Sequence, residues 1–257
     1  MLYRSARVAL LLVALASVMG SAAVRLGAPW GPSGPPRRRG RGLVAPPAPL
    51  GSATMVHRAA ASVSLRSRER KLRLFLELFR PGPETTVVDV GVTDAPFGEG
   101  SSDNFFEAHY PWPERITAVA PTGLERFGAA FPAVTAVSAD GRALPFPDGA
   151  FDLGFSNAVI EHVAGGRDGQ RRFLAELCRV AGRVFVTTPN RFFPLDPHTL
   201  LPFVHWLPDG DRRRRLLRAR GFDYVLDPLG PRAFAALFPY PVRLVSRGMT
   251  LVAVGPL

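Results

Sequence analysis

The stretch Ala139-Asp-Gly-Arg-Ala-Leu-Pro-Phe-Pro-Asp-Gly-Ala-Phe-Asp-Leu-Gly-Phe-Ser-Asn-Ala-Val-Ile-Glu-His-Val163 decides the fold class of this 257-residue chain. It reads as a loop that carries a carboxylate, followed by a buried strand that ends in polar residues. A similar unit, Thr86-Val-Val-Asp-Val-Gly91, lies upstream. Asp89, Asp140 and Asn157 would then stand at three strand ends. The carboxyl ends of parallel strands meet at one edge of an open α/β sheet, where ligands bind, so the sequence predicts a ligand site there.

Strand-like and helix-like patterns alternate along the rest of the chain. Strands are predicted at 86–91, 115–120, 133–138, 151–157 and 183–188, and helices near 102–109, 122–131 and 167–181. After a predicted helix at 231–238, residues 242–254 look like two further strands around Arg247 and Gly248. This alternation is typical of α/β proteins with a doubly wound, mostly parallel sheet.

The phrases Asp140-Gly-Arg-Ala-Leu-Pro-Phe146 and Val159-Ile-Glu-His-Val163 resemble those of class I S-adenosylmethionine-dependent methyltransferases, in the type 11-like group. The resemblance covers about residues 83–254. It implies a Rossmann-like, seven-stranded sheet whose final strand runs antiparallel, with S-adenosyl-L-methionine as the cofactor.

The first motif departs from the usual pattern of this family. Asp89 and Gly91 match the strand-end acid and the first glycine, where bare backbone approaches the methionine part of the cofactor. The second and third glycines are missing, because other residues follow Gly91 directly. The resemblance therefore leaves the contacts of the cofactor carboxylate open among Thr93, Asp94 and Asn104.

By the same resemblance, Asp140 accepts a hydrogen bond from the adenine amino group, and the amide of Gly141 or Arg142 meets the ring. A simple Asp-Gly turn is the alternative for Asp140. Asn157 completes the predicted cofactor set. The acid that usually binds the ribose hydroxyls after the second strand is absent, and Glu125 is the nearest carboxylate. That departure also argues against a nicotinamide enzyme.

His162 is the predicted catalytic residue. It follows the fourth strand, at the position that faces the transferred methyl group in the family. An imidazole with an ordinary pKa of about 6.5 can take a proton from an acceptor hydroxyl. Glu161 and His162 could instead hold a divalent metal, or only anchor the loop, and the residues alone leave these alternatives open. Our prediction includes no metal site.

The segment after the fifth strand is too apolar for an exposed loop. Its pieces Thr187-Thr-Pro-Asn-Arg191 and His205-Trp-Leu-Pro208 resemble a signature of one subgroup of the family. We expect a lid or acceptor wall, with substrate contacts from Asn190, His198, His205 and Trp206. A structural insertion that closes the sheet edge is the alternative.

The positive charge of the chain is concentrated before the predicted domain. The net charge is +11, but residues 1–80 hold 14 Arg or Lys and 2 acids, whereas residues 81–257 hold 18 Arg and 19 acids. The domain itself is near neutral and lacks interleaved basic and aromatic residues. We therefore expect no nucleic-acid partner.

The N-terminal part divides into a hydrophobic segment, 1–25, and a Pro/Gly/Arg-rich linker, 26–54, before a methyltransferase domain, 55–257. The apolar run 8–24 is at the short limit for a membrane span of about 20 residues. Arginines follow it, so the positive-inside rule predicts a cytoplasmic domain tethered to the inner face of the membrane. A cleaved signal peptide and a true start at Met55 are the alternatives.

Residues 56–80 predict an amphipathic helix that ends before Pro81. Its basic residues are expected to face solvent or anionic lipid, and they are Arg66, Arg68, Arg70, Lys71 and Arg73. Lys71 is the only lysine of the chain.

The sequence thus predicts methyl transfer to a small-molecule acceptor, with oxygen as the acceptor atom. Two other functions stay open. One is a degenerate fold that binds a ligand or partner without catalysis, which the missing glycines favour and the intact Asp140 loop opposes. The other is a membrane-tethered interaction protein that acts through its basic arm.

Overall fold

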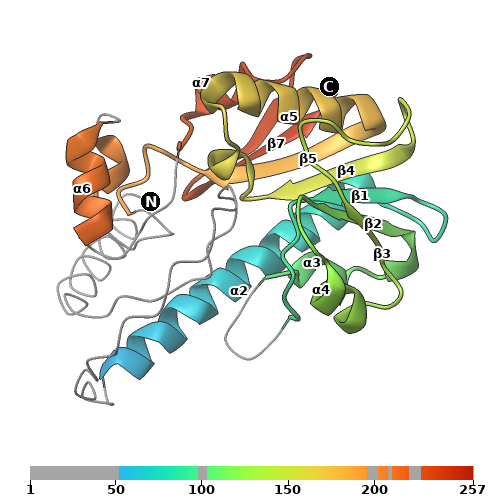
Figure 1. Cartoon of the computed structure of the whole chain (residues 1–257), viewed down its shortest axis with the longest axis horizontal. Coiled ribbons are helices and arrows are strands. Elements are labelled where there is room, and N and C mark those ends of the chain that lie inside the picture. The colour runs from blue at the N-terminus through green and yellow to red at the C-terminus, as the bar shows by residue number, and fades with distance from the viewer. Residues whose placement is uncertain (1–51, 98–102, 196–201, 208–209, 220–226, 257) are drawn as a thin grey trace, which may run out of the picture.

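The computed structural model describes residues 52–97, 103–195, 202–207, 210–219 and 227–256 (Figure 1). The helices are α2 (Ser52–Phe79), α3 (Phe105–His109), α4 (Glu125–Ala130), α5 (Gly166–Val180), α6 (Asp211–Ala219) and α7 (Pro231–Ala235). Short 3₁₀ turns are η1 (Pro113–Arg115), η2 (Ile160–His162) and η3 (Val204–Trp206). The strands are β1 (Val87–Val90), β2 (Ile116–Ala120), β3 (Thr135–Ser138), β4 (Phe151–Asn157), β5 (Ala181–Pro189), β6 (Arg243–Arg247) and β7 (Thr250–Gly255).

The strands form one seven-stranded sheet in the order β3-β2-β1-β4-β5-β7-β6. Strands β1 to β5 pair in parallel, and β7 runs antiparallel to both of its neighbours. The predicted doubly wound, mostly parallel sheet with an antiparallel final strand is confirmed. The chain order reverses direction between β1 and β4, and in such sheets ligands bind outside the carboxyl ends of the strands at this point.

Helices cover both faces of the sheet, with α5 and α7 on one face and α2, α3 and α4 on the other (Figure 1). Successive side chains of a strand point to opposite faces. Val88 and Val90 of β1 accordingly join the core beneath α5, whereas Val87 joins the core beneath α2. Asp89 therefore points toward the layer that contains α2 and α3.

Helix α2 is fixed to the sheet by Phe75, which is fully buried. Its ring makes edge contacts with Phe106 of α3 at 5.3 Å and with Phe155 of β4 and Phe185 of β5 at 5.6 Å each. Aromatic contacts of this geometry stabilise a packed interface beyond area burial alone. Lys71 lies one helical turn before Phe75 and so shares its face of the helix.

Within the described ranges, no helix combines the length and the apolar content needed to cross a membrane. The apolar run at 8–24 and most of the predicted linker lie outside these ranges.

Candidate active site

The polar strand ends meet at the carboxyl edge of the sheet, as the sequence predicts. The register pairs Asp89 with Phe155 of β4 and pairs Asn157 with Thr187 of β5. Gly91, two residues beyond Asp89, therefore comes level with Asn157. Asp140 follows β3 at the same edge, on the far side of β2.

Gly91 provides a stretch of bare backbone at the end of β1. Its φ is +117°, and a Cβ at this position would lie 2.2 Å from a methyl carbon of Val159. Its amide donates a hydrogen bond of 2.8 Å to the carbonyl oxygen of Val119. Both the backbone conformation and the close approach require glycine here.

Side chains hold the loop that lacks the other two glycines. The amide of Thr93 donates to Oδ1 of Asn104 at 3.0 Å, and Nδ2 of Asn104 donates to the carbonyl oxygens of Thr93 and Ala95. Oδ1 of Asp94 accepts from the amide of Phe127 at 2.9 Å, in the first turn of α4. Asn104 and Asp94, which the sequence offered for the cofactor carboxylate, thus use these atoms to shape the loop.

Asp89 and Glu107 form a buried acid pair. Their side chains are hydrogen-bonded to each other, and burial together with Glu107 raises the pKa of Asp89 well above its usual range. Burial also raises the pKa of Glu107. Two buried carboxyl groups in contact favour sharing a proton. Arg68 of α2 is the nearby cation, and its guanidinium lies 3.4 Å from Asp103. Sequence reasoning missed Glu107 because it looks like an ordinary residue of a short helix.

The carboxylate of Asp140 is ionised and open to solvent. Its Oδ2 lies 2.6 Å from the guanidinium of Arg142, and its Oδ1 accepts the amide hydrogen of Arg142 at 2.9 Å. These bonds lower the pKa of Asp140, yet 42% of its side chain remains exposed. Gly141 packs tightly, since a Cβ there would lie 2.6 Å from the ring of Phe173.

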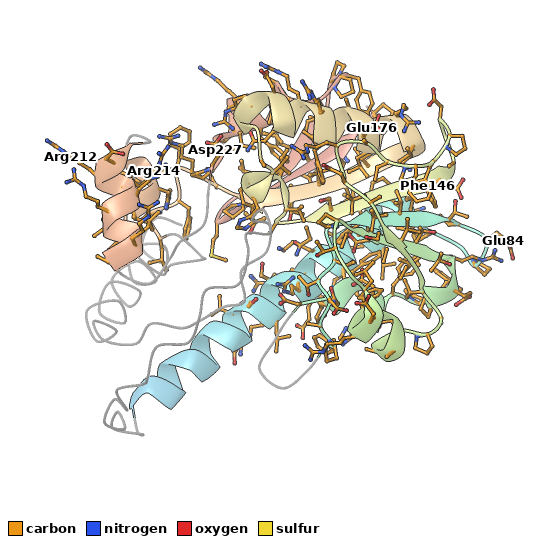
Figure 2. The ribbon with its side chains drawn as sticks, in the orientation of Figure 1. Glu84, Phe146, Glu176, Arg212, Arg214 and Asp227 are labelled. Atoms are coloured by element: carbon orange, nitrogen blue, oxygen red, sulfur yellow. The ribbon has the colours of Figure 1, made fainter. Side chains whose placement is uncertain are left out.

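Helix α5 fixes the loop that carries Asp140. Glu176 accepts the amide hydrogen of Leu144 at 2.8 Å, and Arg179 donates to the carbonyl oxygens of Leu144 and Phe146 at 3.1 and 2.8 Å. Figure 2 shows Glu176 on α5 above Phe146 in this loop. Leu144 is buried in the core under α5. The loop is therefore held rigidly where it leaves the sheet.

Asn157 joins three elements at the centre of the edge. Its Oδ1 accepts hydrogen bonds from Oγ1 of Thr187 at 2.8 Å and from Nζ of Lys71 at 2.7 Å. On the next residue of β5, Oγ1 of Thr188 donates to Oε2 of the buried Glu161 at 3.0 Å.

Lys71 is the main site residue that sequence reasoning missed. Burial, and next the positive charge of Arg68, lower its pKa to about 7, while Glu161 acts in the opposite direction. On α2, Arg66, Arg70 and Arg73 are exposed, but Arg68 and Lys71 turn toward the strand ends. The expectation that the whole basic face meets solvent or lipid is thus wrong for these two residues. Lys71 lies one helical turn before the apolar Phe75, and this spacing could have indicated that Lys71 points toward the sheet.

His162 ends the η2 turn directly after β4 and is half-buried. The chain reaches this turn through Ala158, whose φ is +58°, and the amide of His162 donates to the carbonyl oxygen of Val159 at 2.9 Å. In the part of the chain that the structure describes, no three His, Cys, Asp or Glu side chains gather as a metal site would require. A catalytic role for His162 remains a prediction.

Asn190 binds backbone at the end of β5. Its Nδ2 donates to the carbonyl oxygen of Gly248 at 2.9 Å, and its Oδ1 accepts from the amide of Phe192 at 3.0 Å. The first of these bonds connects the end of β5 to the turn between β6 and β7, and the second is local. His198, another predicted acceptor contact, lies outside the described residues.

The other two predicted acceptor contacts differ in exposure. His205 is buried, and its Nε2 lies 2.6 Å from the carbonyl oxygen of Phe193. Trp206 is 46% exposed and makes an edge contact with Phe203 at 4.7 Å. Of these two, Trp206 is the one whose ring is open to a ligand.

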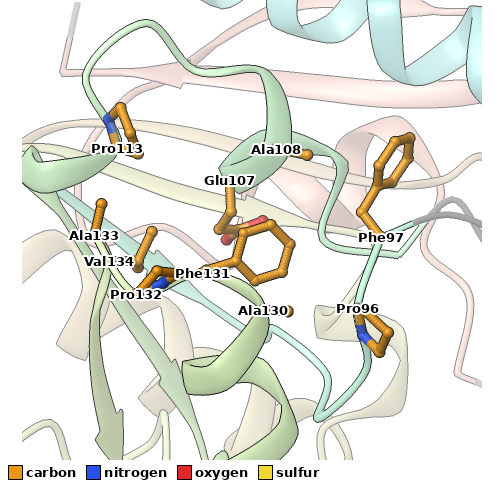
Figure 3. A pocket seen from close by; sticks show the side chains of 10 residues that line it. All are labelled: Pro96, Phe97, Glu107, Ala108, Pro113, Ala130, Phe131, Pro132, Ala133 and Val134. Carbon is orange, nitrogen blue, oxygen red and sulfur yellow. The ribbon is translucent and has the colours of Figure 1, made fainter.

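A pocket of about 510 Å³ borders the acid pair through Glu107 (Figure 3). It is lined by Pro96, Phe97, Glu107, Ala108, Pro113, Ala130, Phe131, Pro132, Ala133 and Val134. Pro113 and Val134 precede β2 and β3, so part of this pocket lies near the amino ends of those strands. None of the predicted site residues lines it, and the position of the polar strand ends is the better guide to the cofactor.

Comparison with known proteins agrees with this geometry. Residues 94–183, from the loop after β1 into β5, match the family model described as a methyltransferase domain. The PH0226 protein from Pyrococcus horikoshii OT3 is similar in fold, with 18% identity, a TM-score of 0.50 and coverage of 74% of this chain and 89% of that one. No curated protein sequence matches the chain significantly.

Two further solved structures illustrate the range of similar proteins. An S-adenosylmethionine-dependent methyltransferase from Thermotoga maritima, described as a possible histamine N-methyltransferase, has 17% identity and a TM-score of 0.49, with 78% of this chain and 91% of that one covered. The [4+2]-cyclase SpnF has 20% identity and a TM-score of 0.37. That match covers 48% of this chain, which spans less than half of SpnF (45%).

The sheet order is that of a Rossmann-like fold, and residues 94–183 match a methyltransferase domain, so the described part of the chain has the architecture of class I methyltransferases. S-adenosylmethionine is the cofactor that this domain implies.

Proposed function

We propose that the protein transfers the methyl group of S-adenosylmethionine to a hydroxyl group of a small molecule. The observation that carries this proposal is that Gly91, Asp140 and Asn157 lie at the same edge of the sheet. Residues 94–183, which include part of this edge, match a methyltransferase domain. The choice of oxygen rests on the half-buried His162, which follows β4 at the predicted methyl position and can accept a proton from a hydroxyl group.

The residues at this edge fit parts of the cofactor. The bare backbone at Gly91 suits close approach of the methionine part. The ionised, exposed carboxylate of Asp140 suits an exocyclic amino group. The amide of Arg142 is already bonded to Asp140, which leaves the adenine ring to the amide of Gly141. The exposed Glu125, at the start of α4, is the carboxylate available to the ribose hydroxyls.

The bound cofactor supplies a methyl group already activated by its sulfonium charge, so the protein needs little covalent chemistry of its own. Its residues must align the acceptor, exclude water and remove a proton. We assign acceptor contact to Trp206 and to the segment that Asn190 and His205 anchor, together with His198. His162 is the proton acceptor that the sequence suggests.

Transfer of isotope-labelled methyl groups tests this proposal. The full chain would be incubated with methyl-labelled S-adenosylmethionine and sets of small molecules that differ only in carrying a hydroxyl, an amine or a thiol. We expect label in a methyl ether, and less of it with the Asp140→Ala variant at a cofactor concentration that does not saturate that variant. Label found on nitrogen, sulfur or carbon would contradict the assignment to oxygen.

A second candidate function is cofactor binding without methyl transfer. The observation that favours it is the altered loop after Gly91, which Asn104 and Asp94 hold in place of the missing glycines. Stoichiometric binding of S-adenosylhomocysteine, with no label transferred to any acceptor class, would support this alternative.

We further propose that residues 8–24 tether the domain to the inner face of the membrane. The support is in the sequence alone, where an uncharged apolar run is followed by Arg25, Arg37, Arg38, Arg39 and Arg41.

A further inference from the structure

We propose that Lys71 of α2 is the catalytic base that removes the proton from the acceptor hydroxyl. This inference rests on the proposed methyl transfer, and it gives the role of proton acceptor to Lys71 in place of His162, the residue that the sequence suggested. It assigns to α2 a chemical role in addition to its role in covering the sheet.

The position of the amine supports this role. Nζ of Lys71 lies 2.7 Å from Oδ1 of Asn157, at the carboxyl end of β4. The sheet register places Asn157 level with Gly91, the glycine that opens the cofactor loop. The amine is therefore at the same edge, beside the strand ends where donor and acceptor must meet.

The surrounding contacts hold the amine in one place. Phe75, one turn further along α2, is locked among rings from α3, β4 and β5. Asn157 is itself oriented by a 2.8 Å hydrogen bond from Thr187. Because Oδ1 of Asn157 accepts one N–H of the lysine, the lone pair of a neutral amine is left to face the acceptor.

The charged groups around Lys71 favour the neutral amine. Arg68 faces it from the preceding turn of α2, and Glu161 faces it from η2. Asp89, Glu107 and Asp103 lie near Arg68 and partly balance that charge. Burial and the charge of Arg68 outweigh Glu161, so the pKa of Lys71 falls to about 7 and much of the amine is unprotonated at neutral pH.

The residue type is itself informative. The chain has 32 Lys and Arg residues, and all of them except Lys71 are arginine. A guanidinium stays protonated in proteins, whereas a buried lysine loses its proton readily. The chain's general preference for arginine is therefore broken at position 71, where the proposed mechanism needs a side chain that can lose its proton.

The proposed step balances in atoms and charge. Nζ of Lys71 takes the hydroxyl proton as the acceptor oxygen forms its bond to the methyl carbon. The methyl–sulfur bond breaks, and its electron pair stays on sulfur. One positive charge thus passes from the sulfonium to the lysine ammonium, which then releases its proton to solvent.

Nuclear magnetic resonance of the full chain tests the inference without any acceptor. With ¹³C-labelled lysine, Lys71 gives the only lysine side-chain signal, and its shift can be followed from about pH 5 to about pH 11. We expect a midpoint of about 7. In Asn157→Asp, a carboxylate beside the amine should raise this midpoint. Arg70→Ala, a change at an exposed neighbour on α2, should leave it unchanged. A midpoint near the ordinary 10.5 of lysine would overturn the inference.

Three variants then separate the base from the cofactor site. Lys71→Met and Lys71→Arg should still bind S-adenosylhomocysteine in calorimetry, but methylate the acceptor found in the labelled-methyl assay roughly 10²- to 10⁴-fold more slowly. The rate increase with a midpoint of about 7 should be absent from Lys71→Met, in which His162 is intact, and should remain in the exposed-site control Arg70→Ala. Full turnover by Lys71→Met would overturn this inference alone. Failure of the unmodified chain to bind S-adenosylhomocysteine would instead contradict the proposed function.

Discussion

Gly91 combines two constraints that no other residue type meets. Its φ lies in the left-handed region, and its Cα faces Val159 with no room for a side chain. The next part of the turn is instead held by two hydrogen bonds with Asn104, which accepts from the amide of Thr93 and donates to its carbonyl oxygen. A loop of this class can therefore keep its shape with one glycine, provided that a neighbouring helix supplies the missing contacts.

Gly91→Ala should destabilise the protein by roughly 2–4 kcal/mol, because the strained φ and the contact with Val159 both oppose a Cβ. Urea unfolding measures this change. The matched control is Gly128→Ala in α4, where nothing lies within 4 Å of the added carbon, and where alanine should stabilise the helix by roughly 0.5–1 kcal/mol. Equal stability of the two variants would show that Gly91 is not constrained as described.

The acid pair predicts a particular pH dependence of stability. In the folded state the pKa of Asp89 is raised above its unfolded value of about 3.9. The folded chain therefore binds more protons than the unfolded chain above that pH, and stability falls as the pH rises. The Glu107→Gln variant should lose part of this slope, because burial still raises the pKa of Asp89 but the acid that adds to this effect is gone. Melting temperatures measured from about pH 5 to about pH 8 test this expectation; parallel curves would contradict it.

Helix α2 connects the fold to the chemistry of the site. Phe75→Ala should lower the free energy of unfolding by roughly 3–5 kcal/mol, since a fully buried ring would be removed from between α3 and the sheet. Val63→Ala, at a half-exposed position of the same helix, should change it by less than about 0.5 kcal/mol. A Phe75→Ala effect as small as that of Val63→Ala would mean that α2 is not anchored through this ring.

Most elements could be predicted from the sequence because their signals are local. Buried β-branched runs such as Val87-Val88 and the polar residues that end them define the strands and the ligand edge. The partners of the site side chains could not be predicted, because they depend on the packed structure. Asp94 caps α4 from another loop, and Lys71 reaches Asn157 across 86 residues of sequence. Basic residues on several sides of α2 hid the direction in which Lys71 points.

At the level of the entire chain, the basic N-terminal part and the near-neutral domain suggest separate tasks. If residues 8–24 are a membrane anchor, the full chain should sediment with membranes after cell breakage, and deletion of that segment should release it. The deletion should leave binding of S-adenosylhomocysteine unchanged, because no predicted cofactor contact comes from that segment. Equal partitioning of both forms into the supernatant would contradict a tether.

The match to a methyltransferase domain and the proposed function together imply that the strand ends form a working cofactor site despite the altered loop. Calorimetric titration of the full chain with S-adenosylhomocysteine, beside Asp140→Ala, tests that claim most directly. We predict saturable one-to-one binding that weakens about 10- to 100-fold in the variant, as expected when a charged hydrogen-bond acceptor is lost. Absence of binding by the unmodified chain, or equal affinity of the two proteins, would contradict the account.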